Sequence, residues 1–153
     1  MITSKPKKKI LPKLPPGQEV FSTFDVIRII DIERERLREW MKRKFIPAGI
    51  KVSWRGRKKV IWGKNDLYSI LLFKLLVESG WPRVVAAQDV DRVDWDQVRI
   101  NKEKHLIVAH NSSTGERMMI YPSTDRSLIG IKDFETATYI NLEKITEDID
   151  SRV

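Results

Sequence analysis

The segment Ile50–Trp62 restricts the fold most, because it joins two short β-forming stretches through a turn glycine. The stretches Ile50–Trp54 and Lys59–Trp62 contain residues that favour strands, and glycine is a typical turn residue. The sequence therefore predicts a β-hairpin with Arg55-Gly56-Arg57-Lys58 at its tip. The cations between Arg55 and Lys59 repel one another, which favours an anionic partner beside the tip.

Two helices are expected before the hairpin. Ser22 or Thr23 can accept a backbone N–H and cap the first one. Apolar side chains then recur at helical spacing, namely Phe24, Val26, Ile27 and Ile30. Asp31 and Ile32 interrupt this pattern and predict a tight turn into a second helix from about Glu33 to Lys44.

The second helix is expected to be amphipathic, with cations on its outer face. At about 100° a residue, one side holds Leu37, Trp40, Met41 and Lys44. The far side holds Arg38 and Lys42, flanked by Arg36 and Arg43 and with Glu35 and Glu39 between them. This arrangement fits either an ordinary solvated helix or a helix that contacts a polyanion.

Two further helices are expected after the hairpin. The third begins near Asn65 or Asp66, is apolar nearly all round, and ends at Gly80. Pro82 can start a short fourth helix that runs through Gln88. The resulting order is helix, turn, helix, hairpin, helix, short helix.

Over roughly Phe21 to Asp89 this order resembles the MerR-type winged helix-turn-helix. The resemblance rests on four pieces of sequence: Arg36-Leu37-Arg38-Glu39-Trp40, Lys44-Phe45-Ile46-Pro47, Asn65-Asp66-Leu67 and Glu78-Ser79-Gly80-Trp81. Two departures from the family pattern stand out. Val60 lies where the second wing strand usually carries an arginine, and residues 92–153 show no long dimerising heptad helix.

The charge is divided unevenly along the chain. Residues 1–91 carry a net charge of +10 and residues 92–153 carry −2, within a total of +8. Residues 1–18 alternate lysines with prolines, which predicts a flexible basic arm. The expected organisation is this arm, a MerR-like domain over residues 19–91, and a small domain over residues 92–153, giving an α+β protein.

The resemblance implies a bacterial or archaeal transcriptional regulator that binds double-stranded DNA. The second helix would lie in the major groove, with Arg36 and Arg38 reaching base edges and Lys42 and Arg43 nearer the backbone. Glu35 would accept from cytosine or orient the arginines. The wing cations Arg55, Arg57, Lys58 and Lys59 would bind phosphates.

The second part of the chain is expected to be a small α+β unit. A hairpin is predicted from Leu106–Ala109 and Arg117–Tyr121, and Ser127–Ile131 and Thr136–Ile140 can add strands. An amphipathic helix from about Asn141 closes the chain. We expect this unit to form a homodimer, bind a protein partner or sense an effector.

Catalysis and cofactors find no support in the sequence. There is no cysteine, P-loop or dinucleotide-binding glycine motif, and His105 and His110 are spaced to point to opposite faces of one strand. We therefore expect no catalytic residue, no metal and no cofactor. With no signal peptide or membrane span evident, a cytoplasmic, nucleoid-associated protein is expected.

Three alternatives stay open at this point. An architectural or recombination-directionality factor would use the same fold to bend DNA. An antitoxin-like module would bind DNA with one part and a partner protein with residues 92–153. RNA binding would require exposed stacking aromatics, whereas Trp40, Phe45 and Trp62 are assigned to the core.

Overall fold

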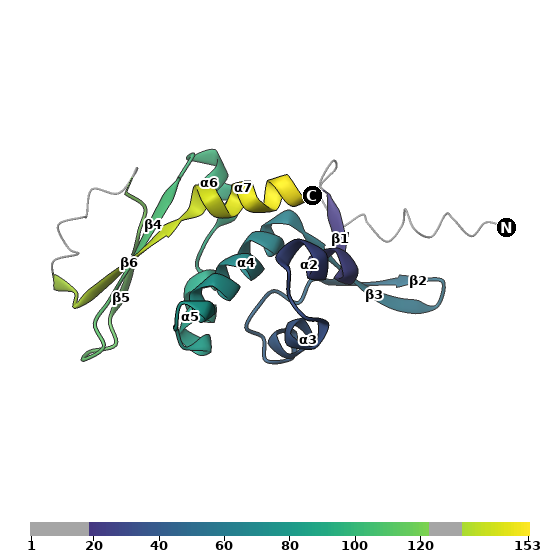
Figure 1. Cartoon of the computed structure of the whole chain (residues 1–153), viewed down its shortest axis with the longest axis horizontal. Helices are drawn as coiled ribbons and strands as arrows, with labels where there is room; N and C mark the ends of the chain where they lie inside the picture. Colours follow the sequence, from purple (N-terminus) through teal and green to yellow (C-terminus); the bar gives the residue numbers. More distant parts are fainter. Residues whose placement is uncertain (1–18, 123–132) are drawn as a thin grey trace. The chain divides into compact units, whose positions relative to one another are not determined.

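The computed structural model describes residues 19–122 and 133–153 (Figure 1). Within these residues the chain is α+β, with six helices and two three-stranded antiparallel sheets. It divides into two compact units, the first ending at Val93 and also taking in the last two residues, the second spanning Asp94–Ser151. The expected basic arm over residues 1–18 and the expected strand Ser127–Ile131 lie outside the described residues.

The first unit contains the sheet made by the predicted hairpin. β2 (Ile50–Trp54) pairs with β3 (Arg57–Gly63), and β3 also pairs with the short strand β1 (Val20–Ser22), giving the order β1-β3-β2. The sequence did not predict β1, because three residues are too few to show an alternating pattern.

Helix α2 (Thr23–Ile30) begins at the predicted cap. The Ser22 hydroxyl accepts from the backbone N–H of Asp25 at 3.2 Å, and the Asp25 carboxylate accepts from the backbone N–H of Ser22 at 3.0 Å. The predicted apolar stripe is partly wrong, because Phe24 is 67% exposed. Val26 and Ile30 are buried as predicted and Ile27 is half-buried, and the core face also includes Ile29, which was not assigned to the stripe.

Helix α3 (Arg34–Lys42) follows after a turn in which Asp31 has a left-handed backbone, with a φ of 60°. It is shorter than predicted, since Lys44 also has a left-handed backbone and lies beyond its end. Leu37 and Trp40 are buried, as the sequence indicates.

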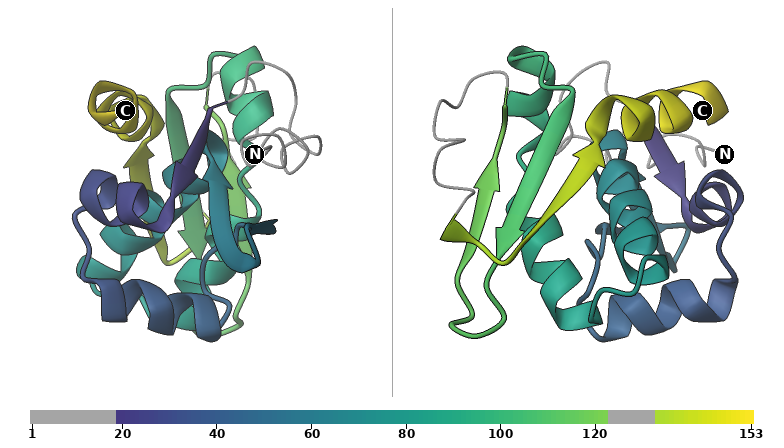
Figure 2. Two further views of the ribbon diagram at one scale, coloured as in Figure 1. Left: turned by 90° about the vertical axis from the view of Figure 1, so that its right-hand side faces the viewer. Right: turned by 60° about the vertical axis from the view of Figure 1, so that its left-hand side comes forward.

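Helix α4 (Lys64–Glu78) is the centre of the first unit, with eight buried residues. The Asp66 carboxylate accepts from the backbone N–H of Gly63 at 3.1 Å at its start. Burial raises the pKa of this carboxyl group, although the hydrogen bond from Gly63 acts in the opposite direction. Helix α5 (Arg83–Asp91) follows Pro82 as expected. Figure 2 shows α3 crossing beneath α4 within this unit.

The second unit contains a three-stranded sheet and two helices. Its strands are β4 (His105–His110), β5 (Arg117–Ile120) and β6 (Thr136–Asn141), in the order β5-β4-β6. Helix α7 (Leu142–Arg152) buries Leu142, Ile145 and Ile149, the face that the sequence predicts. Helix α6 (Trp95–Ile100) was not predicted, because six residues give little more than one turn and a half.

The side-chain carboxylate of Glu135 holds the β4–β5 loop of this unit through hydrogen bonds. Glu135 accepts from the backbone N–H and the hydroxyl of Ser112 and from the hydroxyl of Ser113, at 2.7 to 3.0 Å. These hydrogen bonds lower the pKa of Glu135.

Among the helices in the described part of the chain, none has the length and apolar character needed to cross a membrane.

Candidate nucleic-acid interface

The outer face of α3 carries two cations without partners. Arg38 and Lys42 are exposed, and within residues 19–122 and 133–153 neither side chain forms a hydrogen bond or an ion pair. Arg43 lies 3.9 Å from Glu39, and both side chains are more than half exposed, so this pair is weak. Three of the four predicted helix cations are therefore available to an anionic ligand.

Arg36 differs from these three. Its guanidinium carbon lies 5.4 Å from the centre of the Trp40 ring, a distance at which a cation and an aromatic face attract. The indole N–H of Trp40 is buried and has no hydrogen-bond partner among the described residues. Arg36 therefore lies toward the core side of the helix rather than at the middle of its outer face.

The turn of the hairpin is narrower than predicted. Trp54 pairs with Arg57, so only Arg55 and Gly56 form the turn. Both have a positive φ, 51° and 77°, as in the type I′ turns that suit the twist of a hairpin. The predicted four-residue tip is thus wrong, because Arg57 and Lys58 already belong to β3.

The strand pairing separates the predicted hairpin cations onto two faces. Arg57 and Lys59 share one face, since side chains alternate along a strand. Lys58 lies on the other face, opposite Ser53. Lys51, two residues before Ser53, is on the same face as Lys58. Lys51 was missed as a candidate, although the alternation of β2 could have identified it.

The hairpin contains no acidic residue that could neutralise its cations. Residues 50–63 contain five cations and no carboxylate. Four of these cations are exposed and have no hydrogen-bond or ion-pair partner in the described ranges, namely Lys51, Arg57, Lys58 and Lys59. Together with Arg38 and Lys42 on the outer face of α3 they make a set of six cations that are unpaired within the described ranges.

The base of the hairpin is fixed to the core. Trp62 is fully buried, and its indole N–H donates to the carbonyl of Pro47 at 3.3 Å. Gly49 has a φ of 74°, and a Cβ there would lie 2.7 Å from the carbonyl oxygen of Ile61. Only glycine therefore fits where the chain turns into β2.

Aromatic contacts and one lysine hold α3 in place. Trp40 packs edge-on against Phe73 of α4 at 4.7 Å between ring centres, and Phe45 stacks on the same ring at 5.7 Å. The Lys74 ammonium donates to the carbonyls of Ile30 and Asp31, at 3.3 and 3.1 Å, where α2 ends. These contacts hold the start of the turn before α3 and the C-terminal end of α3 itself. The assignment of Trp40 and Trp62 to the core is confirmed, and Phe45 is half-buried.

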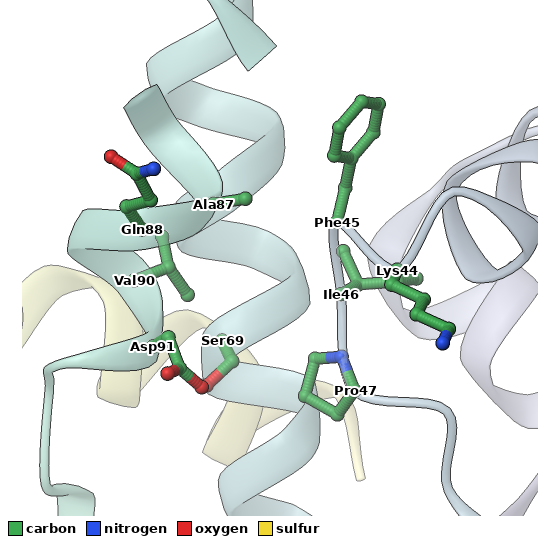
Figure 3. Close-up of a pocket in the computed structure, with 9 residues that line it drawn as sticks. All are labelled: Lys44, Phe45, Ile46, Pro47, Ser69, Ala87, Gln88, Val90 and Asp91. Atoms are coloured by element: carbon green, nitrogen blue, oxygen red, sulfur yellow. The ribbon is translucent and has the colours of Figure 1, made fainter. Parts of the chain in front are cut away.

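Two concave regions lie on the first unit. A shallow hollow of about 500 Å³ follows the outer face of α3 and is lined by Glu35, Arg38, Glu39, Lys42 and Arg43. A second cavity of about 400 Å³ lies after the end of α3 (Figure 3) and involves Phe45, Ile46, Pro47, Ala87 and Val90, with Ser69 and Asp91 at one end. None of the predicted DNA-binding residues lines the second cavity.

Metal-binding geometry is absent from the part of the chain that the structure describes, since no three histidine or acidic side chains converge there. His105 instead forms a hydrogen bond with the hydroxyl of Tyr139, its neighbour on the sheet.

A scan against protein-family models finds none that matches this chain, and a search among curated proteins finds no match either.

Proposed function

We propose that this protein is a transcriptional regulator that binds double-stranded DNA sequence-specifically, using a winged helix-turn-helix in its first unit. In this proposal α3 is the recognition helix and the β2–β3 hairpin is the wing. The element order α2, α3, hairpin, α4, α5 is the order expected from the MerR-like pattern. The support is thus the order of elements together with the charge that they expose.

The observation that carries the proposal is the set of six cations, unpaired within the described residues, on the outer face of α3 and on the hairpin. Exposed cations without carboxylate partners repel one another, and phosphates on a duplex would relieve this repulsion. An α-helix fits the major groove of B-DNA, and a narrow hairpin can follow an adjacent backbone. Figure 1 shows α3 along the lower edge of the first unit and the hairpin extending from its right-hand side.

Paired substitutions test this assignment. We expect Arg57→Ala with Lys58→Ala, and separately Arg38→Ala with Lys42→Ala, to weaken binding to duplex DNA at every salt concentration. Each pair should also flatten the slope of log affinity against log salt by about two units, because two phosphate contacts are lost. Fluorescence anisotropy with a labelled duplex measures both effects.

A matched control is available on α5. Arg83 is the first residue of this helix and Arg92 follows its last; both are exposed and have no partner among the described residues. Arg83→Ala with Arg92→Ala removes the same charge without touching either surface. Equal losses from all three pairs would show that only net charge matters, and would contradict the proposed interface.

We further propose that the protein is a homodimer formed through its second unit. Strand β6 is an edge strand among the described residues, and Thr136–Asn141 contains no charged residue. Natural proteins usually protect such an edge with charges or proline, so an unprotected edge favours pairing with another strand. Sedimentation equilibrium of the full chain should give a dimer at micromolar concentration, and a monomer throughout would contradict this.

A further inference from the structure

We propose that the cavity after the end of α3 binds a small organic cation with an apolar body, of the class of the aralkyl amines. The cavity has a volume of about 400 Å³ and lies within the first unit, between residues 44–47 and α5 (Figure 3). None of the predicted DNA-binding residues lines it, so this inference stands apart from the proposed function.

The buried side of the cavity is apolar. Ile46 and Val90 are only 6% and 4% exposed, so they lie at its floor. Phe45, Pro47 and Ala87 are half-buried and form its walls. An apolar cavity of about 150 Å³ already accommodates benzene. The space between these side chains is therefore sufficient for an aromatic ring with a short chain.

The rim of the cavity carries a carboxylate without a partner. Asp91 is exposed, and within residues 19–122 and 133–153 its side chain forms no hydrogen bond or ion pair. Figure 3 shows Asp91 at one end of the cavity beside Ser69, whose hydroxyl oxygen can also accept a hydrogen bond. An ammonium group carries only donors, so it suits this pair of oxygen acceptors.

The end of α5 adds to the preference for a cation. Asp91 is the last residue of α5, and the carbonyl end of a helix carries a partial negative charge. The last turn of α5 contains no basic residue, and Arg92 after it neither lines the cavity nor pairs with Asp91. Lys44 lines the cavity, but its ammonium extends away from Asp91 in Figure 3. A cation is thus favoured at this end and an anion is disfavoured.

The wall formed by residues 44–47 is held in place by contacts of the protein itself. The backbone N–H of Phe45 donates to the carbonyl of Trp40 at 3.0 Å, and the Phe45 ring stacks on Phe73. The carbonyl of Pro47 accepts from the indole N–H of Trp62. A ligand that enters a preformed cavity loses little free energy to ordering, so even a small probe should bind measurably.

The experiment is a titration of the full chain with phenethylamine, followed by assigned heteronuclear NMR. We expect a dissociation constant of about 1 mM or lower, with the largest shift changes in residues 45–47 and 87–91. Phenethyl alcohol and hydrocinnamate keep the ring and the chain but carry a neutral and an anionic group. The alcohol should bind about two- to fivefold more weakly, because an exposed ion pair contributes little, and the anion more weakly still.

Two substitutions connect this binding to the cavity. Asp91→Asn should weaken phenethylamine binding about two- to fivefold and leave the affinity for the alcohol unchanged. Ala87→Leu should abolish binding of both probes, because the Ala87 methyl group points into the cavity in Figure 3. The matched control for Asp91→Asn is Glu147→Gln, which makes the same charge change on an exposed residue of α7 and should leave both affinities unchanged.

Circular dichroism confirms that the variants fold, and Asp91→Asn decides the outcome if Ala87→Leu does not. Shift changes that map to other residues, or none at about 10 mM phenethylamine, would overturn the assignment of this cavity as a ligand site. Equal affinities for the amine and the alcohol, tighter binding of hydrocinnamate, or an unchanged affinity in Asp91→Asn would overturn the assignment of a cation to it.

Discussion

Lys74 shows how a single half-buried residue can position the proposed interface without belonging to it. Its side chain is only 17% exposed, and its ammonium donates to two carbonyls at the end of α2. We expect Lys74→Met to lower the free energy of unfolding by about 1–3 kcal/mol, because charged hydrogen bonds are lost and the Ile30 carbonyl is left without this donor. Urea denaturation followed by circular dichroism measures the change.

Glu78→Gln is the control for this residue. Glu78 lies 3.9 Å from the Lys74 ammonium and is 47% exposed, so its loss should cost less than about 1 kcal/mol. If the two substitutions destabilise the protein equally, the ion pair rather than the carbonyl contacts fixes the lysine. That result would contradict the role given to Lys74.

Periodicity predicted burial well only where a helix has one apolar side. In α3 it identified Leu37 and Trp40 correctly. In α2 the two apolar pairs Val26-Ile27 and Ile29-Ile30 allow more than one choice of core face, and Phe24 was assigned to the core although it is exposed. The contact of Arg36 with Trp40 depends on side-chain direction, which spacing alone does not give. Pairing of cations with carboxylates is likewise visible only in three dimensions.

The β2–β3 hairpin depends on two glycines that play different parts. At Gly49 an added Cβ would meet backbone at 2.7 Å and the Val60 side chain at 2.8 Å, whereas at Gly56 nothing lies within 4 Å. Both have a positive φ. We expect Gly56→Ala to cost about 1–2 kcal/mol from its backbone conformation alone, and Gly49→Ala to cost more than about 3 kcal/mol. The urea concentration at the midpoint of unfolding, compared at an unchanged m-value, measures both losses of stability.

The same pair of variants separates stability from binding. Gly56→Ala should leave the hairpin cations in place and retain most of the DNA affinity, whereas Gly49→Ala should displace the hairpin and weaken binding. Equal destabilisation by the two variants would show that the chain around Gly49 relaxes readily, contrary to the rigid attachment described above.

Elements of moderate length with clear borders were predictable, and short ones were not. The hairpin, α4 and α7 follow from β-forming stretches, caps and apolar spacing. The turn residues were misplaced, because a basic run around one glycine fits several turn lengths. β1 and α6 give too short a pattern to recognise, and β1 depends on pairing with β3, which is distant in sequence.

At the scale of the whole molecule, the division of charge matches a division of structure. The described residues of the basic part, 19–91, lie in the first compact unit, and most of the described residues of the slightly acidic part lie in the second. We infer that polyanion binding belongs to the first unit alone. The second unit keeps an uncharged edge strand that is suited to contact with another protein chain.

The most direct test of the account is the salt dependence of binding between the unmodified full chain and duplex DNA. Six unpaired cations predict a slope of log affinity against log salt of about −5 for each chain bound, and roughly a thousandfold loss of affinity between 50 and 200 mM salt. A slope near zero, or no binding at 50 mM salt, would contradict the claim that these cations form a DNA-binding surface.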